Sequence, residues 1–230
     1  MNYSFLQCGE GALTVHLGDG IDPAINRRVT ALQGAIGSAG LRGITDLIPA
    51  YADLTVCYDC TVISAKALQR QLRRLLDSLS VAGQDRRRVF QLPVCYGGDY
   101  GPDLDFVCHH SGLSAQEVIA LHSAPDYLIY MLGFLPGFAY LGGLDPRLHT
   151  PRLDSPRTCI PAGSVGIGGA QTGVYPLASP GGWQLLGRTP VSVFDRQRQE
   201  PILYRAGDLV HFVPISPAEY EEIVLSLIHI

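Results

Sequence analysis

The chain has 230 residues, of which 47% are hydrophobic and 17% are charged, and its formal net charge is −4. This length and composition predict a globular protein with one large domain or two small ones. The acidic balance argues against binding to nucleic acid or to an anionic membrane. Lys66 is the only lysine and lies in a helical pattern, which excludes a lysine-containing phosphate loop.

The start of the chain lacks the basic segment and apolar run of a secretory signal. No stretch of about 18 apolar residues is present, so we expect no membrane span. The 6 cysteines are dispersed through apolar contexts and are typical of reduced thiols. Together these features predict a soluble, cytoplasmic protein.

The first ninety residues alternate strand and helix patterns. Asp22 and Pro23 form a helix start, and the helical spacing ends in the glycines of residues 37–40. A second helix begins at Ser64 and has a leucine-rich face. Strands are expected at residues 3–8, 12–17, 44–50, 54–58 and 89–94. This order resembles a ferredoxin-like β-α-β-β-α-β unit, which is an α+β fold.

The polar run Gln84–Arg88 predicts a domain boundary, with domains at residues 1–87 and 88–230. Beyond it, a short helix is expected within residues 101–112, and Ser114 with Glu117 forms a capping box for another. Strand-like runs then dominate, and their glycine and proline punctuation favours a β-barrel or sandwich. They lie at residues 126–134, 164–169, 183–187, 190–195, 201–204 and 208–215.

The end of the chain combines two patterns. Residues 217–224 begin like a charged terminal helix, whereas the final LSLIHI is apolar apart from one histidine. We expect this tail to be a truncated or foreign end and assign it no functional role.

Residues 131–189 are the most informative segment, because glycine and proline recur every few positions while aromatic residues remain frequent. Such a composition predicts fixed turns on a β framework that line a concave small-molecule site. The alternative is a barrel whose corners need Gly and Pro and whose aromatic rings only pack, and composition alone does not separate the two. The candidate site residues are Phe134, Pro136, Gly137, Phe138, Tyr140, Arg152, Arg157, Pro161, Gly163, Ser164, Gln171, Tyr175, Trp183 and Arg188.

Other motifs favour structural roles. The glycines of residues 163–169 do not form GxGxxG in any register, and Ser164 is not in a GxSxG elbow. Cys57 and Cys60 form one isolated CxxC, and no metal site is expected from them or from the scattered histidines. Those histidines are His109, His110, His122 and His149, and the nearby Asp99, Asp103 and Asp105 are interpreted as helix-capping carboxylates.

The motifs PVCYGGDYGPDLDFV, YLIYMLGFLPGFAYLGGLD, IPAGSVGIGGAQTGVYP and SPGGWQLLGRTP resemble the family of the B subunits of prokaryotic ATP-dependent 5-oxoprolinase. This family includes the histidine-kinase inhibitor KipI and was formerly labelled allophanate hydrolase subunit 1. The resemblance extends over about residues 1–217 and implies an N-terminal α+β domain followed by a cyclophilin-like β-barrel. The LSLIHI tail does not match.

The resemblance also implies an activity and partners. The B, C and A subunits of 5-oxoprolinase would together hydrolyse 5-oxo-L-proline to L-glutamate, with ATP and Mg²⁺ serving the assembled complex. No catalytic residue and no ATP-binding residue is assigned to this chain. The alternative is a KipI-like, non-enzymatic inhibitor that binds a sensor histidine kinase; a peptidyl-prolyl isomerase is suggested only by the barrel type.

These implications lead to hypotheses about single residues. Arg152 or Arg157 would hold the substrate carboxylate, because a guanidinium fork matches a carboxylate. The rings of Phe138, Tyr140 and Trp183 would wall the substrate ring. Backbone N–H groups of residues 163–164 would stabilise developing negative charge. Another polypeptide would close this pocket.

Overall fold

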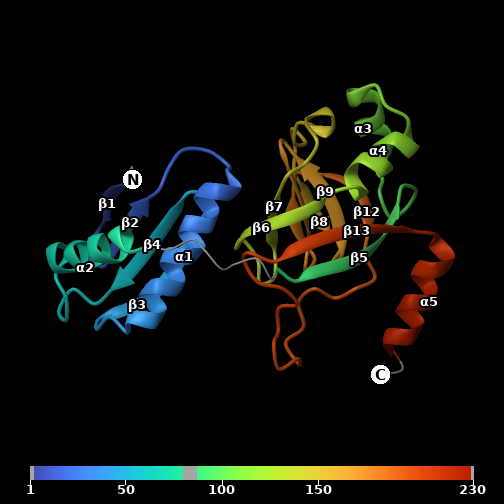
Figure 1. Ribbon diagram of the computed structural model, residues 1–230. Coiled ribbons are helices and arrows are strands. Elements are labelled where there is room, and N and C mark those ends of the chain that lie inside the picture. Colours follow the sequence, from blue (N-terminus) through green and yellow to red (C-terminus); the bar gives the residue numbers. More distant parts are fainter. Residues whose placement is uncertain (1–2, 80–86, 229–230) are drawn as a thin grey trace. The chain divides into compact units, whose positions relative to one another are not determined.

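The computed structural model describes residues 3–79 and 87–228 of the chain. It divides the chain into two compact units, Met1–Arg86 and Arg87–Ile230 (Figure 1). The first part of the polar run Gln84–Arg88, where the sequence predicts a boundary, lies outside the described residues.

The N-terminal unit is an antiparallel sheet of order β1-β2-β4-β3. Residues on β4 are alternately half-buried and buried, which is the period expected of a strand with one covered face. Leu54 and Val56 on β4 therefore join the core formed with the helices. The strands are β1 (Ser4–Cys8), β2 (Ala12–His16), β3 (Ile44–Pro49) and β4 (Asp53–Tyr58).

Two helices pack against this sheet, α1 (Pro23–Ala39) and α2 (Ala65–Asp77). Both begin where the sequence predicts, because the Asp22 carboxylate accepts from the Ala24 N–H and the Ser64 hydroxyl accepts from the Ala67 N–H. Their buried residues recur at helical spacing, as on α2, where leucines 68, 72 and 76 face the core.

The order of elements in this unit differs from the expected ferredoxin-like order. The described order is β-β-α-β-β-α, and the strand predicted near Val89 is β5 (Val89–Tyr96), which belongs to the C-terminal unit. The reason is local: the turn at residues 9–11 folds β1 onto β2, so β1 already pairs with that edge of the sheet.

The C-terminal unit is a closed barrel, whose described strands follow the order β10-β7-β6-β13-β5-β12-β9. All neighbours pair antiparallel except β13 and β5, which pair in parallel. Its further strands are β6 (Asp126–Leu132), β7 (Ala139–Gly142), β9 (Ser164–Gly168), β10 (Gln171–Val174), β12 (Gln184–Arg188) and β13 (Leu209–Ile215), and β8 (Arg157–Ile160) and β11 (Ser179–Gly181) form a separate ribbon.

The barrel agrees with the predicted strands at β5, β6, β9, β12 and β13. The strands predicted at residues 190–195 and 201–204 are wrong, because the described backbone there makes one isolated bridge, between Phe194 and Ile202. Prolines at 190 and 201 offer no N–H to a ladder, which disfavours regular pairing at these ends.

Three helices were expected in this unit, and all three are present. The helices are α3 (Leu104–Ser111), α4 (Ala115–Ser123) and α5 (Pro217–Ile228). The capping box between Ser114 and Glu117 begins α4. Helix α5 continues beyond the predicted residues 217–224 into the apolar end. Among the described residues, no helix combines the length and apolarity needed to cross a bilayer.

Candidate functional site

The aromatic residues of the predicted site form a small core of their own. Phe138 lies at its centre, with ring centroids 5.1 Å from Tyr140, 5.4 Å from Tyr175 and 5.5 Å from Trp183, all edge-to-face. Phe138, Tyr175 and Trp183 are each at most 4% exposed. These three rings are enclosed by protein, and in this conformation they do not line an open concavity.

The glycines around these rings make room for them. A Cβ on Gly168 would collide with the indole nitrogen of Trp183, and one on Gly181 would lie 2.6 Å from the Tyr175 hydroxyl. The glycine-rich run of β9 is buried throughout. It therefore packs against the indole as a barrel strand and is unsuited to wrap a phosphate.

Arg157 is held in an ion pair inside the unit. Its Nη2 lies 2.6 Å from Oδ1 of Asp103, whose Oδ2 accepts a 2.6 Å hydrogen bond from the Leu185 N–H. Asp103 precedes α3, but its side chain makes no capping hydrogen bond, so the predicted capping role is wrong. Because its guanidinium is engaged by Asp103, Arg157 is a poor candidate for a substrate clamp.

Arg152 is the better placed of the two candidate arginines. Its side chain is exposed, and its guanidinium carbon lies 5.8 Å from the centroid of the Trp183 ring. Within the described residues it has no ion pair with a carboxylate. A guanidinium that stacks on an aromatic ring and whose N–H groups are not used elsewhere can donate hydrogen bonds to a carboxylate.

The backbone donors at residues 163–164 are already used. The Gly163 N–H donates to the Tyr175 carbonyl at 2.7 Å, and the Ser164 N–H donates to the Pro161 carbonyl at 3.3 Å. The hypothesis that they stabilise negative charge is therefore wrong for this conformation. Arg188 also serves the turn, because its Nε donates to the Ala162 carbonyl at 2.9 Å.

Residues 133–138 form a tight turn with an unusual backbone. Phe134 has φ of 70°, the one positive φ of a non-glycine residue among the described positions, and it is 64% exposed. The turn is tied by hydrogen bonds from the Gly133 N–H to the Phe138 carbonyl and from the Tyr204 hydroxyl to the Gly137 carbonyl. A strained, exposed aromatic ring on a fixed turn is typical of a contact residue.

The other predicted residues lie around this region. Tyr140 is half-buried against the aromatic core, and Pro136 is exposed on the turn. Gln171 opens β10 and is half-buried. The structure thus brings Phe134, Phe138, Tyr140, Tyr175 and Trp183 together, with Arg152 at the indole.

His122 is the centre of a buried polar chain. Its Nδ1 lies 2.8 Å from the Tyr96 hydroxyl and its Nε2 lies 2.8 Å from the Thr172 hydroxyl. Because Thr172 also donates to the Gly166 carbonyl, we assign the proton to Nε2. Burial lowers the pKa of His122 to about 3, so the imidazole is neutral. It has a structural role, as expected.

No metal site emerges from the described residues, where no three His, Cys, Asp or Glu side chains could share an ion. The cysteines there, including Cys57 and Cys60, are free thiols.

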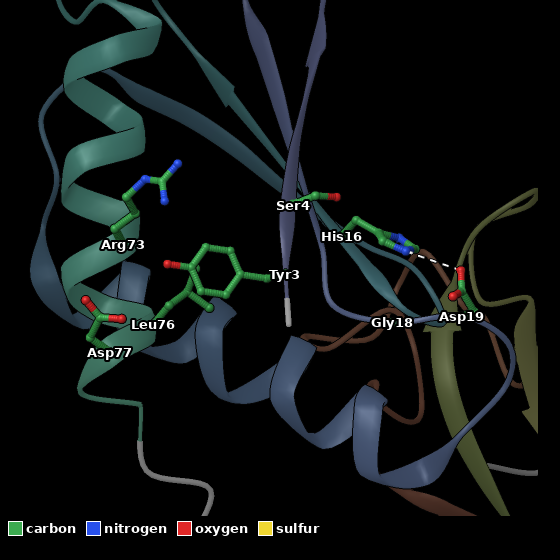
Figure 2. A pocket seen from close by; sticks show the side chains of 8 residues that line it. All are labelled: Tyr3, Ser4, His16, Gly18, Asp19, Arg73, Leu76 and Asp77. Atoms are coloured by element: carbon green, nitrogen blue, oxygen red, sulfur yellow. Dashed lines mark ion pairs between the residues drawn. The ribbon is translucent and has the colours of Figure 1, made fainter. Parts of the chain in front are cut away.

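A well-formed cavity lies elsewhere, on the N-terminal unit, with a volume of about 730 Å³. Arg73, Leu76 and Asp77 on α2 form one wall, and His16 and Asp19 lie beyond the start of β1 (Figure 2). His16 has its Nδ1 2.8 Å from Asp53, and this hydrogen bond raises its pKa. Sequence reasoning missed this cavity, because its residues come from three separate segments of no distinctive pattern.

Most of the chain matches a known protein family. The family described as "Carboxyltransferase domain, subdomain C and D" matches residues 3–204. The 5-oxoprolinase B subunit of Bacillus subtilis (strain 168) is 42% identical over 230 residues, covering 96% of this chain and 96% of that protein. The 5-oxoprolinase B subunit of Escherichia coli O157:H7 is 45% identical over 207 residues, covering 90% of this chain and 93% of that protein.

A solved structure extends the comparison to the fold. The crystal structure of TTHA0988 has a TM-score of 0.78 and 42% sequence identity, covering 89% of this chain. The match covers 40% of that solved chain, so this chain spans about two fifths of its length.

Proposed function

The chain belongs to the family of the carboxyltransferase domain, subdomains C and D, and to that of the 5-oxoprolinase B subunits; on this premise we propose that it is the B subunit of an ATP-dependent 5-oxoprolinase. In this proposal it hydrolyses 5-oxo-L-proline to L-glutamate only in complex with the C and A subunits. The observation that carries the proposal is 42% identity along 96% of both chains.

The chemistry favours a subunit over a complete enzyme. A lactam is a poor electrophile, so its hydrolysis at neutral pH needs activation of the amide and of a water molecule. In the described part of the barrel, the charged groups that contact the aromatic core include Arg152 and Arg157, and Arg157 is paired with Asp103. Neither arginine can act as a general base at neutral pH, so we assign the activating groups to a partner chain.

In the described part of the chain, the glycine-rich strand β9 does not fit the phosphates of ATP. The glycines of β9 pack against Gln184 and Trp183, where a Cβ on Gly166 or Gly168 would collide, and their strand is buried. The described residues also hold no cluster that could ligate Mg²⁺. We therefore assign the binding of ATP and Mg²⁺ to a partner chain.

Within the complex, Arg152 would hold the carboxylate of 5-oxoproline. Its position over Trp183 limits its motion while its donors remain accessible. Phe134 and Pro136 are exposed on the neighbouring turn and would contact the partner chain that encloses the substrate beside Arg152. The length of TTHA0988, of which this chain matches 40%, supports a further polypeptide adjoining this fold.

Reconstitution tests the proposal. The chain is purified alone and with the C and A subunits, and ATP-dependent release of glutamate from 5-oxoproline is measured. Activity in the mixture of all three proteins and none in the isolated chain is the expected result. An assembled complex that is inactive, or a chain that binds a sensor histidine kinase and neither of these partners, would favour the inhibitor role instead.

The role of Arg152 has a matched control in Arg196, which is also exposed. We expect Arg152→Ala to lower kcat/KM of the complex by about tenfold or more, since a charged hydrogen bond contributes about 1.5–3 kcal/mol. Arg196→Ala should leave kcat/KM unchanged. Equal kinetics for the two variants would exclude Arg152 as the carboxylate contact.

A further inference from the structure

The cavity on the N-terminal unit carries opposite charges that the fold leaves unpaired. Arg73 and Asp77 lie four residues apart on α2, and both line the cavity. Among the described residues neither makes an ion pair, although this spacing permits one. The arginine precedes the acid, which is the less favourable order for a pair within a helix.

Arg73 is instead held by an aromatic ring. Its guanidinium carbon lies 5.1 Å from the centroid of the Phe5 ring on β1. Stacking of this kind fixes the plane of the guanidinium and leaves its N–H groups free to donate. In Figure 2 the guanidinium extends from α2 toward the neighbouring strand β1.

Asp77 occupies an electrostatically unfavourable place. It is the last residue of α2, where the carbonyl ends of the helix carry partial negative charge. A carboxylate there gains from a cation that approaches from solvent. Tyr3 faces α2 across the cavity, with its hydroxyl directed toward the helix (Figure 2), and Leu76 adds an apolar surface to the lining.

We propose that this cavity binds a free α-amino acid, with its carboxylate on Arg73 and its ammonium group on Asp77. An α-amino acid carries its carboxylate and its ammonium group on the same carbon, so the protein groups that bind them must lie close together. Two side chains four residues apart on a helix are neighbours on its surface and meet this requirement. The volume of about 730 Å³ is ample for such a ligand and lies in the usual range of small-molecule sites. The ligand's side chain would extend past Tyr3 toward His16.

This inference is independent of the function proposed above. The cavity lies within the N-terminal unit, whereas Arg152 and the aromatic core lie in the barrel. If no amino acid binds, the function proposed for the barrel is therefore unaffected. If the reconstituted complex is inactive, the proposal that the cavity binds an amino acid is likewise unaffected.

The test is a nuclear magnetic resonance titration of the full chain with L-glutamate, L-leucine and L-lysine. Saturable shifts of amides at residues 3–5 and 73–78, in the millimolar range or tighter, are expected for at least one of them. The N-acetyl and carboxamide derivatives of that amino acid should bind at least about tenfold more weakly, because each lacks one of the two charges.

Arg73→Gln and Asp77→Asn should each weaken binding by about tenfold or more. Arg74→Gln is the matched control, since Arg74 is the adjacent exposed arginine and does not line the cavity. Among the described residues Asp77 makes no ion pair and its side chain is exposed, so Asp77→Asn should leave folding intact. Absence of saturable shifts with all three amino acids, or undiminished binding by Asp77→Asn, would overturn the proposal.

Discussion

The aromatic segment of the barrel and the cavity beside α2 differ in how their polar and charged groups are satisfied. In the barrel, Arg157 pairs with Asp103 and the N–H of Gly163 serves a turn. Beside α2, Arg73 and Asp77 have no ion-pair partner among the described residues. The difference teaches that the polar groups of a distinctive sequence motif can all be used in contacts within the fold. Charged residues of an unremarkable helix, by contrast, can remain available to a ligand.

The largest effect should come from Asp103. Asp103→Asn removes the charge that compensates Arg157 and weakens the contact with the Leu185 N–H. We expect a loss of about 3 kcal/mol in the free energy of unfolding, measured with urea, because one partner of a largely buried pair is left alone. Asp105→Asn, at an exposed position in the first turn of α3, is the control and should change stability little. A loss below about 0.5 kcal/mol for Asp103→Asn would show that the pair is dispensable.

A second test asks whether the glycines of β9 serve packing. Gly168→Ala drives a Cβ into the Trp183 indole and should cost about 2 kcal/mol of unfolding free energy. Gly182→Ala is the control, because its nearest neighbours would be 3.7 Å from the new Cβ. Equal thermal stability of the two variants would contradict the packing role and would restore the hypothesis that β9 binds a ligand.

The buried His122 predicts how the barrel responds to acid. Its pKa is lowered by burial from 6.5 to about 3, so the native state keeps it neutral while the unfolded chain takes up a proton. The stabilisation is complete above pH 6.5 and is lost as the pH falls toward 3, with a slope approaching about 1.4 kcal/mol per pH unit.

Urea unfolding of the wild type between pH 7 and 5 measures this slope. His122→Gln should flatten it, whereas His149→Gln, at an exposed position, should not. An unchanged slope in His122→Gln would assign the acid sensitivity to other groups.

Phe134 differs from the other aromatic residues of this segment because its ring is exposed. Replacing it should have the smallest effect on stability of the changes considered. Phe134→Gly relieves the positive φ and should raise the unfolding free energy by up to about 1 kcal/mol. If the ring contacts a partner, the same variant should bind the C subunit more weakly, which a titration of the two purified proteins measures. Unchanged affinity would exclude Phe134 from this contact.

Helix starts were predictable because their signals lie within a few residues. Asp22 and Pro23 begin α1, and the pair Ser114 and Glu117 begins α4 through hydrogen bonds across three residues. Strands failed where their pattern was broken by glycine, as in β10, or where proline prevented pairing, as at residues 190–195.

The candidate site was predictable as a cluster but not in its roles. Composition alone brought the aromatic residues of 131–189 to notice, and they do meet around Phe138. Composition could not predict the ion pair between Arg157 and Asp103, because those residues are 54 positions apart in the chain. Nor could it distinguish a ring that walls a pocket from a ring that is enclosed.

The amino-acid sequence by itself determined the family, the capped helices and the strands with uninterrupted apolar patterns, since each depends on neighbours close along the chain. Only the tertiary structure decided the closure of the barrel, the pairing of Arg157 and the unpaired charges of Arg73 and Asp77. The physical reason is that hydrogen bonds and ion pairs depend on the distance between two groups in space. For groups far apart in the sequence, that distance is set only when the strands that carry them pair.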